Sequence, residues 1–165
     1  GEGACYALEG LVPLYAATGN DVVLQLCQKA TAFAAVWTYF FDLPTAYKGI
    51  ARGGQCCRMP DVPLLFPVGP AKAIPSLLQL WQLSGDNLYL CLADEMAAFI
   101  SKYQIEAEGK AWDGGMIHAL VQFSGKHWGP DLSGQVDTGI TSGNCLSALE
   151  YWLQNRDDKS MSISG

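Results

Sequence analysis

The chain contains an internal repeat. The segment from Ala7 to Ala34 aligns without a gap on the segment from Ala73 to Ile100. An ungapped match of this length indicates a structural repeat rather than a chance similarity between two helices. In the first copy, the identical residues are Ala7, Leu11, Leu14, Gly19, Leu24, Leu26, Ala32 and Phe33.

Each copy is predicted to be a pair of helices joined by a tight turn. In the first copy, apolar residues at 8–15 follow the i, i+3, i+4, i+7 spacing of one helical face. Gly19 then suits a left-handed position, and Asn20 or Asp21 can cap the next helix. The second copy repeats this turn at 84–87.

The repeat predicts an all-α fold of helical hairpins. Hairpins are expected at about 4–43 and 70–104, and a third begins at about 143–155, where residues 142–144 are expected to cap its first helix. The segments between hairpins, 44–69 and 109–141, are much longer than the turns. Each follows a second helix and precedes a first helix, so both are expected at one face, and loops of such length are usually functional.

Composition narrows the possible partners. Half of the residues are hydrophobic and 16% are charged, which suits one domain with a real core. The net charge is -6 and no cluster of Lys or Arg is present, which argues against nucleic acid and anionic membranes as partners. No apolar run reaches the roughly 18 residues of a spanning helix.

The cysteines favour a reducing compartment. Cys27 and Cys91 fall inside apolar helical patterns and are expected in the core. The adjacent Cys56 and Cys57 make a poor disulfide framework. We therefore expect a cytoplasmic protein.

The two long segments hold residue types suited to sugar chemistry. Glycines leave room for a ligand to approach the backbone, as in the run 52–57. Tryptophans offer flat faces to a pyranose ring, and aspartates serve as general acid, general base or nucleophile. The candidates are Arg58 and Asp61 in the first segment, and Trp112, Asp113, His118, His127, Trp128, Asp131 and Asp137 in the second.

The hairpins resemble those of the six-hairpin glycosidases and related (α/α)6 toroids. The resemblance lies in the pattern Leu-x-x-Leu-Tyr/Trp, then Thr/Ser-Gly-Asn/Asp, then an apolar-rich helix, and it covers the two repeats. It implies an inner ring of first helices with a pocket near their N-terminal ends, fed by the long loops. It also implies a carbohydrate substrate and glycoside hydrolysis, or an epimerase or lyase reaction, because these toroids support several chemistries. No cofactor is expected.

For a hydrolase, two carboxylates must flank the scissile bond. Asp113 and Asp61 are the favoured pair, with Asp131 and Asp137 as further candidates. The expected sugar contacts are Trp112, Trp128, His127, His118 and Arg58. Each has a structural alternative, because aspartates also shape turns and cap helices and large aromatic residues anchor long loops.

Cysteine suggests another mechanism. Glu2, Cys5, Cys56 and Cys57 are similar in type and order to the zinc ligands of the zinc-dependent β-L-arabinofuranosidases, and four such ligands suit zinc. The spacing from Glu2 to Cys5 and the residues after the cysteine pair depart from that family.

The hairpin count allows a non-catalytic alternative. Two and a half hairpins do not close a ring of six, so residues 1–165 are interpreted as one partial toroid domain. Such a domain exposes apolar surface, which predicts self-association or contact with the remainder of a longer chain. The alternative function is therefore a helical-repeat interaction or scaffold module.

Overall fold

The computed structural model describes residues 2–40, 52–56, 64–106, 108–111, 113–116, 120–121 and 140–157. Within these ranges the regular structure is helical apart from one pair of two-residue strands, which confirms the all-α class. The elements are α1 (Glu2–Thr18), α2 (Asp21–Val36), β1 (Leu64–Leu65), α3 (Val68–Ser84), α4 (Asn87–Lys102), β2 (Leu120–Val121) and α5 (Ile140–Asn155).

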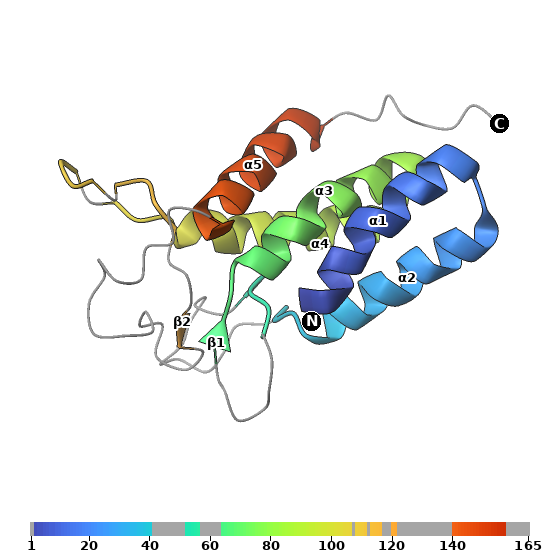
Figure 1. The fold of residues 1–165 in the computed structure, drawn as a ribbon, viewed down its shortest axis with the longest axis horizontal. Coiled ribbons are helices and arrows are strands. Elements are labelled where there is room, and N and C mark those ends of the chain that lie inside the picture. The colour runs from blue at the N-terminus through green and yellow to red at the C-terminus, as the bar shows by residue number, and fades with distance from the viewer. Residues whose placement is uncertain are drawn as a thin grey trace.

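The helices form two layers (Figure 1). α1, α3 and α5 lie side by side, with α3 packed against both of the others. α2 and α4 each pack against the helix that precedes them, and α4 also contacts α5. α3 is therefore the centre of the structure, and it buries Ile74, Leu77, Leu78 and Leu80 completely. The first helices of successive hairpins stack in sequence order, as expected for repeated units; closure into a toroid stays a prediction.

The two turns inside the hairpins have the same geometry. The N–H of Gly19 donates to Tyr15 at 2.8 Å, and that of Gly85 donates to Trp81 at 2.7 Å; both glycines have positive φ. Asn20 Oδ1 accepts from the backbone of the first turn of α2, and Asp86 Oδ1 does the same for α4. The repeat in sequence is thus a repeat in structure, and the first of the two predicted caps, Asn20, is the one used.

Two helix boundaries differ from the prediction. α2 ends at Val36, because the chain then extends and Thr38 forms a bridge with Gln55. α5 begins at Ile140, ahead of the predicted cap. The hydroxyl of Ser142, one of the predicted capping residues, instead accepts a hydrogen bond from the N–H of Met116 at 3.0 Å.

The expectation that both helical cysteines lie in the core is wrong for one of them. Cys27 is fully buried, whereas Cys91 is exposed. Cys91 precedes the buried Leu92 by one residue, and the 3.6-residue period of the helix turns it away from the core. None of the helices described is long and apolar enough to cross a membrane.

Candidate functional site

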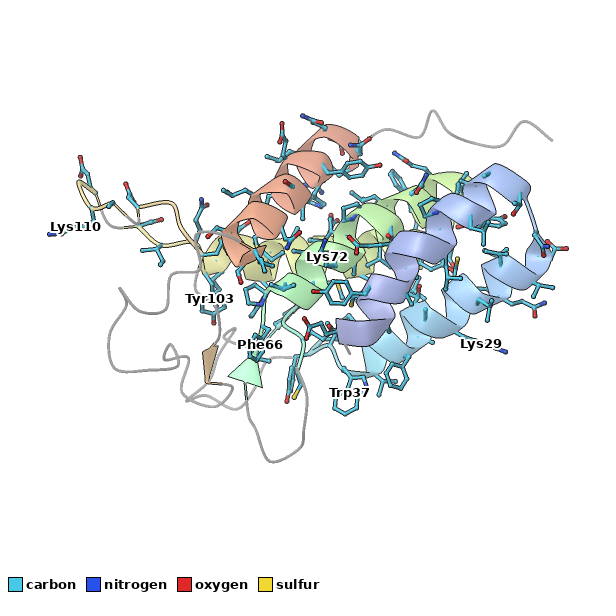
Figure 2. The ribbon with its side chains drawn as sticks, viewed as in Figure 1. Lys29, Trp37, Phe66, Lys72, Tyr103 and Lys110 are labelled. Carbon is cyan, nitrogen blue, oxygen red and sulfur yellow. The ribbon has the colours of Figure 1, made fainter. Side chains whose placement is uncertain are left out.

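The two long connections meet at the end of the molecule where α1, α3 and α5 begin (Figure 1). β1 belongs to the first connection and β2 to the second, and they pair antiparallel. Leu64 lies opposite Val121, and Leu65 lies opposite Leu120. This confirms the prediction that both connections emerge at one face. We call this the loop end; Figure 2 shows Trp37, Phe66 and Tyr103 there.

The glycine-rich run at 52–56 packs against the protein itself. Gly53 has a φ of +80°, and a Cβ on it would lie 1.9 Å from the backbone oxygen of Glu95 in α4. Its N–H donates to the carbonyl of Tyr39 at 2.7 Å, and the Tyr39 N–H donates to Gly54 at 3.0 Å. The sequence suggested that these glycines leave room for a ligand. In the structure, Gly53 leaves room for the α4 backbone instead.

Gln55 ties this run to three helices. The side chain is 1% exposed, and its Nε2 donates to the carbonyl of Ala34 in α2 at 3.2 Å. Its Oε1 accepts from the thiol of Cys5 in α1 at 3.4 Å. A Cβ on Gly69, in the first turn of α3, would lie 2.3 Å from the same oxygen. One buried amide therefore hydrogen-bonds to the start of α1 and the end of α2, and it lies close against the start of α3.

An ion pair fixes the other end of the run. Arg52 Nε donates to Glu95 Oε2 at 2.6 Å, and Arg52 Nη2 donates to Glu95 Oε1. The hydrogen bonds from Arg52 hold the pKa of Glu95 below its ordinary value of 4.5. The pair borders a small cavity of about 300 Å³, lined by Arg52, Asp94, Glu95, Ala98, Phe99 and Lys102. The paired charges orient the run on α4 and leave Glu95 ionised at neutral pH.

Asp113, a favoured catalytic candidate, lies in an exposed turn. Ile105 exchanges backbone hydrogen bonds with Gly114 and Gly115, both at 2.8 Å, and these close a narrow hairpin. Figure 2 shows Lys110 at the far tip of this projection. The N–H of Asp113 donates to the carbonyl of Lys110 at 3.2 Å. Asp113 is thus displayed to solvent, and it lines neither of the cavities described for this structure.

Burial favours the protonated thiol at Cys5 and Cys56, two members of the proposed zinc set. Burial raises the pKa of Cys5 to about 11, and the thiol donates its hydrogen bond to Gln55. Burial also raises the pKa of Cys56. Within the described ranges, no three His, Cys, Asp or Glu side chains gather to hold a metal ion. The described members of the proposed zinc set, Glu2, Cys5 and Cys56, therefore do not form a metal site among themselves, and Cys57 lies outside the described residues.

Most of the predicted site lies outside the described residues. This holds for Arg58 and Asp61 in the first connection. It also holds for Trp112, His118, His127, Trp128, Asp131 and Asp137 in the second. Their contribution to a site stays a prediction.

A groove that the sequence did not predict runs between α2 and α4. Its volume is about 570 Å³, within the range of small-molecule sites. Thr31 lies in the wall of the groove and is only 4% exposed. Its hydroxyl has no hydrogen-bond partner among the described residues. The lining residues are Gln28, Thr31, Ala32, Ala35, Phe40, Asp86, Leu88, Tyr89, Cys91, Leu92 and Glu95.

One sequence feature does relate to this groove. Four of the six residues at 30–35 of α2 are alanine, and the other two are Thr31 and Phe33. The small side chains on the α2 wall leave part of the space between α2 and α4 unfilled. The groove offers an apolar surface with carboxylates at Asp86 and Glu95 and an exposed thiol at Cys91. Such a lining suits binding more than catalysis, because the carboxylate of Glu95 is held by Arg52.

No protein-family model matches the chain, and no curated protein matches it.

Proposed function

We propose that the chain is part of a carbohydrate-processing protein that acts at the loop end, most simply by glycoside hydrolysis. The observation that supports this is the pairing of β1 with β2. It joins the first connection, which carries Asp61 and Arg58, to the second, which carries Asp113 and the tryptophans. We expect residues of both connections to reach one ligand there.

The assignment of sugar as the substrate follows from residue types and from the resemblance of the hairpins to (α/α) toroids. A pyranose stacks on tryptophan faces, and its glycosidic bond needs two carboxylates. Asp113 and Asp61 are the proposed acid and base. The position of Asp113 on a projecting turn suits a residue that closes onto a bound substrate, because turns of this kind move more readily than helices.

The test is turnover of a panel of glycosides by the chain and by the variants Asp113→Asn and Asp61→Asn. Loss of an essential acid or base is expected to lower kcat by at least about 100-fold. The matched control is Asp21→Asn, at the opposite end of the hairpins, because Asp21 is exposed and Asn20 performs the capping there. Full activity in the double variant would contradict the assignment, as would the absence of turnover on any glycoside. An unsaturated or epimerised product would replace hydrolysis with a lyase or epimerase reaction.

A second candidate function is a helical-repeat interaction module. It is supported by the apolar side chains that the α1–α2 hairpin leaves exposed, among them Leu14, Leu26 and Phe33. Apolar side chains clustered on one face of a helical array commonly mark a contact with another protein surface.

A further inference from the structure

The two copies of the repeat differ in how much of the same face they bury. Three of the apolar positions that carry identical residues in both hairpins differ sharply in exposure. They are between 45% and 54% exposed in the α1–α2 hairpin and between 0% and 3% exposed in the α3–α4 hairpin. These positions are Leu14, Leu26 and Phe33 in the first copy, and Leu80, Leu92 and Phe99 in the second.

In the second hairpin this face is covered by the first hairpin and by the connection that follows it. A Cβ on Gly69 would lie 3.7 Å from Glu2 in α1, and one on Gly53 would lie 3.0 Å from Phe99. Leu92 lines the groove that faces α2. The equivalent face of the first hairpin, which we call the α1 edge, therefore points away from the rest of the array. It consists of Gly3, Ala7, Gly10, Leu14, Leu26 and Phe33, all exposed.

α5 exposes the complementary face at the other side of the array. The sequence Ala148-Leu149-Glu150 aligns on Ala7-Leu8-Glu9 of α1. By this alignment, the exposed Leu146 and Leu153 stand at the positions of Cys5 and Val12, which α1 buries completely. Glu150 stands at the position of Glu9, which pairs with Lys72 of α3 at 3.0 Å. The exposed residues Leu146, Glu150 and Leu153 form what we call the α5 edge.

We infer that the α1 edge of one copy of this chain binds the α5 edge of a second copy. α1 of one copy then takes the place beside α5 that α3 takes beside α1 within the chain. This inference is supported by the α1–α3 interface within the chain. The α1 edge is equivalent to the side of α3 that contacts α1, and the α5 edge is equivalent to the side of α1 that contacts α3. Gly3, Ala7 and Gly10 allow the close approach of a second helix, as Gly69 and Ala73 do inside the chain. This inference rests on the second proposed function and is independent of the first.

The geometry predicts an open-ended and weak association. Each copy uses two different surfaces, so contacts repeat head to tail rather than closing as a symmetric pair. α1 has 17 residues and is therefore about 25 Å long. One helix pair of this length buries less than the roughly 1,600 Å² of a standard interface, so dissociation constants well above nanomolar are expected.

The test measures the weight-average mass of the chain by sedimentation up to about 1 mM, the upper end of measurable weak binding. The wild-type mass is expected to rise with concentration. Leu14→Glu and Leu153→Glu are each expected to weaken self-association at least tenfold, because each places a charge in the contact. The matched control is Val22→Glu. Val22 is 63% exposed and its equivalent Leu88 is 65% exposed, so this position stays uncovered even where a neighbouring hairpin is present.

A mixture of variants distinguishes this arrangement from other forms of dimer. Leu14→Glu leaves the α5 edge intact, and Leu153→Glu leaves the α1 edge intact. An equimolar mixture is therefore expected to form a capped heterodimer, although each variant alone stays monomeric. A symmetric dimer through two α1 edges would give no such recovery, and that result would overturn the inference.

Two further outcomes would also overturn it. One is a wild-type chain that stays monomeric over the whole concentration range. The other is an equal loss of association in Val22→Glu, which would indicate nonspecific hydrophobic contact. All three positions are exposed, so circular dichroism is expected to show an unchanged fold in every variant. These measurements involve no sugar, so failure of association leaves the proposed glycoside hydrolysis standing, and failure of hydrolysis leaves the association standing.

Discussion

The glycine-rich run 52–56 and the projecting turn at 108–111 and 113–116 each contain a pair of adjacent glycines, but they differ in structure. Both lie in long connections, and both contain a glycine with φ near +80°. Around Gly53 the backbone of α4 lies so close that no side chain fits. Around Gly114 the nearest atom to an added Cβ is 3.7 Å away, and around Gly109 nothing lies within 4 Å. A glycine therefore marks a close contact in one connection and only a backbone conformation in the other.

The comparison is tested most severely by replacing the two glycines with alanine. Gly53→Ala is expected to lower the free energy of unfolding by about 3 kcal/mol or more, because a strained φ is combined with a clash against backbone. Gly114→Ala meets only the strained φ and is expected to cost about 1 kcal/mol. Urea denaturation of both variants measures the difference. Equal losses would show that the run 52–56 does not pack as described.

Replacement of Gln55 and of Gln104, one glutamine near each of the two glycines, is expected to give effects of intermediate size. Gln55→Leu keeps the side-chain size but removes both buried hydrogen bonds of the amide, the one it donates to the carbonyl of Ala34 and the one it accepts from the thiol of Cys5. The expected loss is about 2 kcal/mol in the free energy of unfolding. Gln104→Leu is the control, because Gln104 also donates to a backbone carbonyl, that of Gly114 at 2.9 Å, but is only partly buried. Its expected loss is below about 1 kcal/mol. A reversed order in thermal melting would contradict the role assigned to Gln55.

The smallest effect concerns the ion pair and depends on pH. The folded-state pKa of Glu95 is lowered from 4.5, so its pairing with Arg52 stabilises the fold above that value. That contribution is lost as the pH falls through the lowered pKa. Both side chains are partly exposed, so Arg52→Ala is expected to cost no more than about 1 kcal/mol at pH 7.

The measurement is the difference in the free energy of unfolding between wild type and Arg52→Ala, followed from pH 7 downward. It is expected to stay constant above pH 4.5 and to shrink below it. A difference that grows on acidification would show that the carboxylate is not stabilised by Arg52.

The parts of the fold that depend on local sequence were predictable. The caps at Asn20 and Asp86 and the left-handed Gly19 and Gly85 are specified by residues within one helical turn of each other. The meeting of the two connections was also predictable, because each connection runs from the second helix of one hairpin to the first helix of the next.

The parts that depend on distant neighbours were not predictable. The surroundings of Gln55 are built from Cys5 and Ala34, which lie 50 and 21 positions away. The repeat also matched Leu26 and Phe33 with residues of the second copy, without indicating that nothing in the described chain covers them. Whether a repeat position is buried depends on its neighbour in the array. Candidate site residues such as Asp113 depend on turn chemistry that serves structure and function alike.

The bonds of Gln55 also imply an order of events in folding. Its amide meets both hydrogen-bond partners only after α1 and α2 have docked, because Cys5 and Ala34 lie on different helices and far from Gln55 in sequence. The helical hairpins form early from local contacts, and the closure of a long loop comes later. We therefore expect the run 52–56 to dock onto the helices after the hairpins have formed. Opening of this run would expose the buried start of α1 at Cys5 and the buried end of α2 at Ala34.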